Sequence, residues 1–380
     1  MPAPTYVPIT PDVLGWAIEQ AGLDAESVAA RTDVDRGVID QWVSGKGQPS
    51  KTQFKKLARL LRRPQAFFFL EAPPADEGVP PAFRHPPSGE RESTREELEA
   101  VRRARRIQKI SIWASERVDD VRWQRNPIPE RQRRSPSEMA AAVREWLNWD
   151  TTEQQAASSA SQVVKFIRTA LEQRGVLALQ LSIGKSGCRG FSLYDERKPV
   201  VAINTHYNPE ARLFTYLHEL GHLTTRADSM CVGYAETATE RWCEAFAAAF
   251  LLPTEHLALR VELRTGGHTV RSIDQARRLA RDFNVSLSAM AIRLDNLGWG
   301  NDLFARVPRD ADLKSGGGGR GADNTRGAAR LRELGEGYFG LLLSAQETGA
   351  LRRQDVLRYL DVTEEQLDRI DHESDQPLRM

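Results

Sequence analysis

The 380-residue sequence contains few cysteines. Cys188, Cys231 and Cys243 are all there are, an odd number without the paired spacing of a cysteine-based metal site. This usage excludes a disulfide-built secreted scaffold and predicts a reducing, cytoplasmic compartment.

Long apolar runs are absent as well. Even the run from Phe67 to Leu70 is brief and follows Pro64, whereas a membrane-spanning helix needs about 20 apolar residues. The N-terminus has no basic region leading into an apolar segment, as a secretory signal would. We therefore expect neither export nor membrane insertion.

An excess of charge of one sign is also missing. Lys plus Arg total 53 against 52 for Asp plus Glu, which gives a formal net charge of +1. No overall field attracts nucleic acid, so any such contact has to come from a local patch. The length and a hydrophobic content of 40% allow two or three domains with real cores.

One stretch carries recognisable chemistry, the His-Glu-x-x-His pattern from His218 to His222. Asn208 as N-cap and Pro209 at the first helical position predict a helix through it. Two histidines four residues apart then lie on one face and can share a metal. Glu219, beside a metal-bound water, can accept its proton, as in zinc hydrolases. The alternative is two ordinary histidines on a helix surface.

A hydrolytic zinc site usually has three protein ligands and one position open for water. The next predicted helix offers three candidates for the third ligand: Glu236, Glu240 and Cys243. Cys243 lies one turn beyond Glu240 and would be a soft ligand.

Three segments together resemble the ImmA/IrrE family of metallopeptidases: His218 to His222, Glu240 to Ala247 and Leu251 to Pro253. The resemblance implies that His218, His222 and Glu240 bind Zn²⁺, with Mn²⁺ as the alternative metal, and that Glu219 is the catalytic base. Cys243 and Glu244 stand where the family commonly has Ala-Asn, so Cys243 and Glu236 remain rivals for the third position.

Residues 11 to 61 have the apolar periodicity of four short helices. The stretch from Asp33 to Gly45, followed by Pro49-Ser50, resembles the recognition helix of the XRE (Cro/repressor) helix-turn-helix family. In that geometry the third helix enters the major groove. The resemblance implies DNA contacts by Arg36 and Gln41, with Lys46 near phosphates.

Acidic residues oppose this DNA-binding interpretation. Asp33, Asp35 and Asp40 place negative charge where phosphates would lie, and Gly37 has no side chain to read a base. The same helices could instead dock a protein partner. A second helix-turn-helix-like pattern lies at residues 273–297, and the resemblance to the ImmA/IrrE family implies that it supports the peptidase region rather than reads DNA.

The predicted fold class is α+β and mainly helical, with a zincin-like metallopeptidase domain that contains a small antiparallel sheet. Three apolar segments predict its strands, at 176–181, 190–194 and 199–204. The expected domains are a helix-turn-helix domain at 1–70, a linker and long helix at 71–134, a metallopeptidase domain at 135–305, a Gly-rich linker at 306–328 and a C-terminal helical segment at 329–380.

The sequence thus predicts a zinc-dependent endopeptidase with a helix-turn-helix module. The family resemblance implies that its substrate is a repressor or antitoxin-like DNA-binding protein, whose cleavage controls gene expression. DNA is a further expected partner, through the N-terminal domain, and a membrane is not. The alternative is a non-proteolytic transcriptional regulator or antitoxin with a structural metal, for which a fourth protein ligand would be the discriminating feature.

Overall fold

The computed structural model describes residues 6–21, 23–61, 63, 65–74, 93–118, 128–185, 187–226, 228–231, 237–308 and 326–373. The chain divides into two compact units, residues 1–103 and 104–380. None of the described helices combines the length and the apolar character that crossing a membrane requires.

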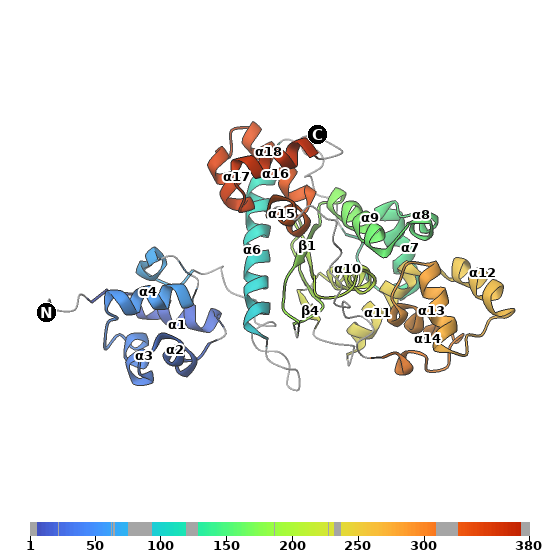
Figure 1. Ribbon diagram of the computed structural model, residues 1–380, viewed down its shortest axis with the longest axis horizontal. Helices are drawn as coiled ribbons and strands as arrows, with labels where there is room; N and C mark the ends of the chain where they lie inside the picture. Colours follow the sequence, from blue (N-terminus) through green and yellow to red (C-terminus); the bar gives the residue numbers. More distant parts are fainter. Residues whose placement is uncertain are drawn as a thin grey trace. The chain divides into compact units, whose positions relative to one another are not determined.

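The first unit contains a bundle of short helices (Figure 1): α1 (Pro11–Gln20), α2 (Ala25–Thr32), α3 (Arg36–Val43), α4 (Lys51–Leu60) and the 3-10 helix η1 (Gln65–Phe69). Side-chain caps fix where helices begin, because Asp24, Asp35 and Ser50 accept hydrogen bonds from the first-turn amides of α2, α3 and α4. Ile39 and Trp42 of α3 are buried in the common core. The predicted helix-turn-helix bundle is confirmed.

The second unit is mainly helical, as predicted. The division between the units falls within α6 (Arg95–Ser115). The later helices are α7 (Pro136–Leu147), α8 (Thr151–Ala156), α9 (Ala160–Gln173), α10 (Pro209–Leu223), α11 (Ala238–Leu251), α12 (Thr254–Thr265), α13 (Ile273–Asp282), α14 (Leu287–Asn296), η3 (Phe304–Arg306), α15 (Arg326–Leu334), α16 (Glu336–Glu347), α17 (Arg353–Leu360) and α18 (Glu364–Glu373).

The sheet of this unit corrects one prediction. Within the described residues it has four strands in the order β1-β3-β2-β4, namely β1 (Leu177–Leu181), β3 (Val200–Asn204), β2 (Gly190–Leu193) and β4 (Ser229–Cys231). The sheet is mixed rather than antiparallel, because β1 pairs with β3 in parallel while β2 is antiparallel to both β3 and β4. The first three strands alternate in direction, but β3 lies between β1 and β2. Two strands of the same direction thereby become neighbours.

Helices cover both faces of the sheet. Helix α10 packs against β2 and β3, and α9 packs against α10. Helix α6 lies on the other side of the sheet (Figure 1). Its Gln108 is buried and donates hydrogen bonds to the carbonyls of Leu193 and Lys198. The side chain of Gln108 thus holds the two ends of the β2–β3 connection.

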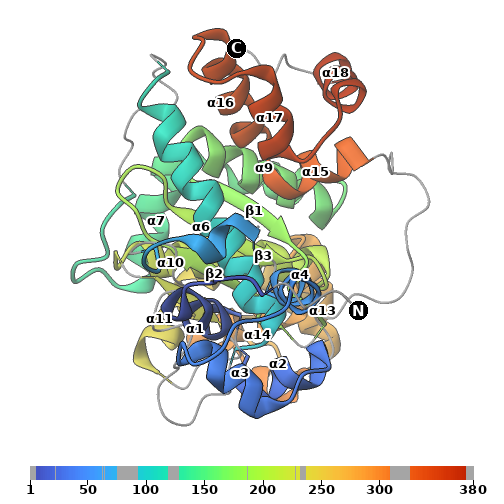
Figure 2. The ribbon, with the colours of Figure 1, turned by 90° about the vertical axis from the view of Figure 1, so that its left-hand side faces the viewer.

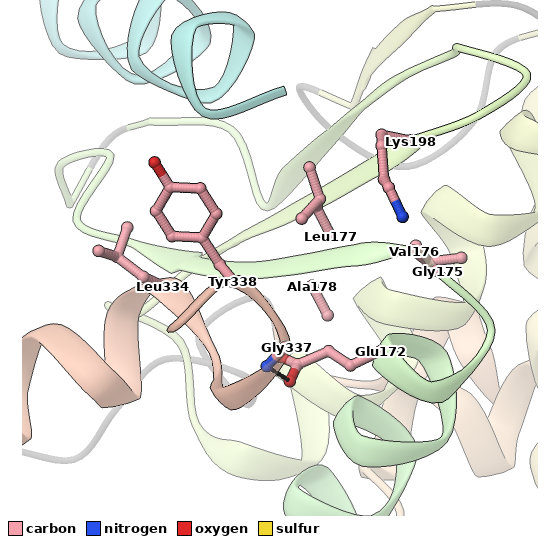
Figure 3. Close-up of a pocket in the computed structure, with 9 residues that line it drawn as sticks. All are labelled: Glu172, Gly175, Val176, Leu177, Ala178, Lys198, Leu334, Gly337 and Tyr338. Carbon is pink, nitrogen blue, oxygen red and sulfur yellow. Dashed lines mark hydrogen bonds between the residues drawn. The ribbon is translucent and has the colours of Figure 1, made fainter. Parts of the chain in front are cut away.

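The C-terminal helices dock onto the open side of β1, where α15 packs on β1 and α16 on α9 (Figures 1 and 2). The carboxylate of Glu172 accepts a hydrogen bond of 2.8 Å from the amide of Gly337 (Figure 3). Glu172 also pairs with Arg168. A Cβ at Gly335 would lie 2.1 Å from a carboxylate oxygen of Glu172, so only glycine fits this junction. The β1 edge is therefore covered by the chain itself.

Candidate metal centre

The helix that carries the histidine pair is α10. Asn208 caps it by accepting a 2.8 Å hydrogen bond from the amide of Ala211, and Pro209 occupies the first turn, as predicted. The helix is buried on every side, and His218 and His222 are only 6% and 4% exposed. They are not ordinary surface histidines, which removes the alternative interpretation of the pattern.

Helix α11 brings a carboxylate to these imidazoles. Thr237 caps the helix by accepting a hydrogen bond from the amide of Glu240, which places Glu240 in its first turn. One oxygen of Glu240 lies 3.0 Å from His218 Nε2, and the other lies 3.3 Å from His222 Nε2. The two Nε2 atoms are 3.2 Å apart.

These three side chains form a group whose donor atoms suit a metal ion. A tetrahedral zinc ion with bonds of roughly 2.0–2.1 Å separates neighbouring ligand atoms by about 3.3 Å. The separations of 3.0, 3.2 and 3.3 Å are close to that value. Two imidazoles and one carboxylate also form a donor set that hydrolytic zinc sites use, with a fourth position left over. The residues present therefore fit a divalent metal.

The structure bears differently on Glu236 and Cys243, the two other candidates for the third metal ligand. Glu236 lies outside the described residues. Cys243 is fully buried and its thiol is hydrogen-bonded to His222, but it is not a member of the three-residue group. A Cβ at Gly221 would lie 3.2 Å from Cys243 Sγ, so the close approach of α10 and α11 depends on a glycine there.

The cluster distributes charge unevenly. Burial lowers the pKa of His218. Burial acts in the same direction on His222, but its contacts with Cys243 and Glu240 outweigh it and raise the pKa of His222 to about 11. Burial would raise the pKa of Glu240, yet its hydrogen bonds to the two histidines lower it. A metal ion would compete with protons for these side chains, because imidazoles and a carboxylate bind a metal in their deprotonated forms.

Glu219 lies beside this group without belonging to it. It is fully buried, and its Cγ would be 3.2 Å from a Cβ at Gly190, the first residue of β2. Such a Cβ would also lie 2.6 Å from Thr215 Cγ2. This contact was not predicted from the sequence, although a glycine in a strand pattern indicates close approach of another segment.

The residues predicted to contact DNA lie on the outside of the first unit. Arg36 is 65% exposed and is 3.6 Å from Glu26 and 3.8 Å from Asp40. Gln41 and Lys46 are exposed, and the Lys46 amide donates a 2.8 Å hydrogen bond to the Gln41 carbonyl. Asp35 caps α3 through the amide of Gly37. Its negative charge thus has a structural use at the helix N-terminus.

Comparison with known protein families bears on both units. Residues 171–295 match the IrrE N-terminal-like domain family, and residues 14–64 match the helix-turn-helix family. The chain thus contains a metallopeptidase-type domain of the IrrE N-terminal-like family and, before it, a helix-turn-helix DNA-binding domain. Both resemblances in the sequence are confirmed. No curated protein matches the chain.

Proposed function

We propose that the chain is a zinc-dependent endopeptidase of the His-Glu-x-x-His type. The observation that carries this proposal is the approach of His218, His222 and Glu240 to within 3.3 Å of one another, with Glu219 in the adjoining position of α10. These three residues would hold Zn²⁺, or Mn²⁺ as the alternative. When bound, the metal would supply polarisation of the scissile carbonyl and a water of lowered pKa.

Glu219 performs the proton transfer in this proposal. Its carboxylate takes the proton of the attacking water and later gives it to the leaving amine. The burial of Glu219 supports the role, because it keeps bulk water away from the carboxylate. Its exclusion from the three-residue group supports a base rather than a ligand.

The substrate would be a repressor or antitoxin-like DNA-binding protein in the cytoplasm. An extended segment of it can add to a sheet edge, where backbone hydrogen bonds align the scissile bond. Of the two edges, β1 is covered by α15, whereas β4 lies beside β2, the strand whose first residue approaches Glu219. We therefore place substrate binding at the β4 edge.

DNA binding by the first unit completes the proposal. Arg36 and Gln41 would contact bases and Lys46 a phosphate. Because Asp40 and Glu26 lie close to Arg36, binding is expected to be weak at physiological salt.

The second candidate is a regulator with a structural metal. A closed structural site needs a fourth protein ligand, and Cys243 is the residue that favours this reading, since its thiol contacts His222.

The test compares Glu219→Gln, His222→Ala and the control Glu210→Gln, which lies in the first turn of the same helix. Metal analysis should show metal in all except His222→Ala. Partners that co-purify with the wild-type chain are incubated with it, and mass spectrometry then identifies cleaved species. Glu219→Gln should lower this cleavage by roughly 100- to 10,000-fold. Cleavage unchanged in Glu219→Gln would overturn the peptidase and favour the structural metal.

A further inference from the structure

Gly190 is the residue at which β2 meets the helix of the proposed base. It is the first residue of the strand and is buried. It is not among the described glycines that have a positive φ, so its backbone conformation does not itself require a glycine. The space around Gly190, rather than its conformation, therefore explains why a glycine occupies this position.

The space that a side chain at position 190 would need is already filled. A Cβ there would lie 2.6 Å from Thr215 Cγ2, 2.8 Å from the carbonyl oxygen of Ala202 and 3.2 Å from Glu219 Cγ. Carbon atoms in contact are normally roughly 3.5–4.0 Å apart. The backbone of β2 therefore packs directly against these two side chains of α10.

The side chains of Thr215 and Glu219 lie one turn apart on α10, so both face β2. Thr215 is 4% exposed and Glu219 is fully buried. The hydroxyl of Thr215 donates a 2.8 Å hydrogen bond to the carbonyl of Ala211, which fixes its rotamer and with it the place of its methyl group. The stem of Glu219 thus packs beside a fixed methyl group and against the strand backbone.

A carboxylate acts on a water molecule beside a metal only from one place, and a misplacement of about 1 Å can lower a rate by a factor of about 100. Glu219 is not a member of the three-residue metal group, so a metal bond would not hold it there. We propose that Gly190 is a positioning residue. Its missing side chain lets β2 hold the stem of Glu219 where the carboxylate can take the water proton. The inference rests on the peptidase function proposed above.

Binding of acetohydroxamate to the zinc-loaded, full-length chain tests this position without a substrate. A hydroxamate binds zinc through its two oxygens and can donate a hydrogen bond to a carboxylate held beside the metal. Gly190→Ala and Glu219→Gln should each weaken binding by about 10-fold, since a hydrogen bond to a charged group contributes at least that factor. The variant with both substitutions should bind no more weakly than Glu219→Gln, because the carboxylate that the alanine displaces is already missing. Isothermal calorimetry measures all four affinities.

Gly187→Ala is the matched control for strain in the strand connection. A Cβ at Gly187, which precedes β2, would lie 2.3 Å from the carbonyl oxygen of Ile183, and its three nearest atoms all belong to Ile183. This variant should therefore lower the melting temperature, as Gly190→Ala does, but leave the hydroxamate affinity unchanged. Zinc content should equal that of the wild type in every variant.

A second substitution on α10 should relieve the effect of Gly190→Ala. Thr215→Ser removes the methyl group at the 2.6 Å contact and keeps the hydroxyl that bonds to Ala211. Added to Gly190→Ala, it should restore part of the hydroxamate affinity. If Gly190→Ala alone does not fold, this double variant takes its place and is compared with Thr215→Ser.

Cleavage provides a second measurement, with a peptide that spans the site cut in a co-purified partner. Gly190→Ala should lower kcat by about 100-fold with little change in KM, and it should lower kcat no further in the Glu219→Gln background. Failure of the peptidase proposal looks different, because cleavage then survives Glu219→Gln.

Four results would overturn the role of Gly190. Hydroxamate affinity and kcat could be unchanged in Gly190→Ala, or they could fall equally with and without Glu219→Gln, which would indicate a structural role only. Loss of zinc from Gly190→Ala would show that the strand supports the metal ligands instead. A wild-type chain that binds no hydroxamate would remove the site on which the inference rests.

Discussion

Two helix-turn-helix corners, the turn between α2 and α3 and the turn between α13 and α14, have the same local turn geometry but different surroundings. Between α2 and α3, Asp33 has a left-handed φ of 58° and Asp35 caps the next helix. Between α13 and α14, Asn284 has a φ of 54° and Ser286 is the cap. A valine follows the left-handed residue in both, Val34 in the first corner and Val285 in the second. The turn chemistry is the same, since Asp and Asn tolerate this conformation.

Burial separates the two corners. Helix α3 buries only Ile39 and Trp42, so one face is free to contact DNA. In α14 every residue from Ser288 to Leu294 is buried, and the helix packs against α11, which carries Glu240. Counting from the cap, exposed Asp40 corresponds to Ala291, which is fully buried. A helix-turn-helix corner therefore identifies a way to join two helices, and the free face decides whether it can read DNA.

The largest effect is expected from a substitution at this matched position of α14. Ala291→Asp places an unpaired carboxylate in the core of the second unit and should destabilise it by about 3–5 kcal/mol. Asp40→Ala, at the same position of α3, should change stability by less than about 0.5 kcal/mol, because it is at the surface. Urea unfolding of the full-length variants measures both. Equal effects would show that α14 is as free as α3.

The second prediction concerns buried lysine. Lys198 is 1% exposed, and burial lowers its pKa from 10.5 to about 8. The unfolded chain then binds more protons than the folded one between these values, so stability should rise with pH from about 8 to 10.5, by up to about 3 kcal/mol. Lys198→Met should remove the rise, while Lys55→Met, on the exposed face of α4, should keep it. Denaturant midpoints across this pH range give the answer.

The third prediction compares the two helix-turn-helix corners in DNA binding. Arg36→Ala should weaken DNA binding by about 1–3 kcal/mol if α3 lies in the major groove. Arg278→Ala removes an exposed arginine of α13 and should change nothing, since the neighbouring α14 has no free face. Fluorescence anisotropy with a selected operator, at two salt concentrations, compares them. Equal losses in both variants would indicate unspecific attraction to phosphates.

The smallest expected effects come from the caps. Asp35→Ala and Ser286→Ala each remove one acceptor from a helix N-terminus, from Gly37 and Ala289 respectively. Each should destabilise the protein by about 1 kcal/mol. Asp35→Asn and Ser286→Thr retain an acceptor and should restore most of it. A clearly larger loss for one corner would show that its side chain does more than cap.

Much of the candidate site could be predicted from residues close together in the chain. Asn208 and Pro209 start α10 as expected, and the four-residue spacing places His218 and His222 together. These are local interactions, determined within one or two helical turns. The choice of Glu240 rested on a family resemblance. No local rule could predict that a carboxylate oxygen of Glu240 in α11 lies 3.3 Å from His222 Nε2 in α10.

The order of the strands in the sheet could not be predicted from interactions between neighbouring residues. The three predicted strands are present, but the predicted antiparallel sheet was wrong, because β3 lies between β1 and β2, and β4 was not predicted. Strand order depends on which edges are free when the segments meet, and that is decided by contacts between distant residues. The approach of Gly190 to Glu219 depends on that order.

By itself, the sequence determined the helices, their caps, the left-handed corner residues and the histidine pair, because each depends on neighbours a few residues away. Only the tertiary structure decided which helix-turn-helix corner keeps an exposed face, since α14 packs against α11, a helix distant in sequence, while α3 leaves Arg36, Asp40 and Gln41 exposed. Tertiary packing likewise decided that two buried imidazoles meet one carboxylate. Burial and assembly are properties of the whole chain, so no short stretch encodes them.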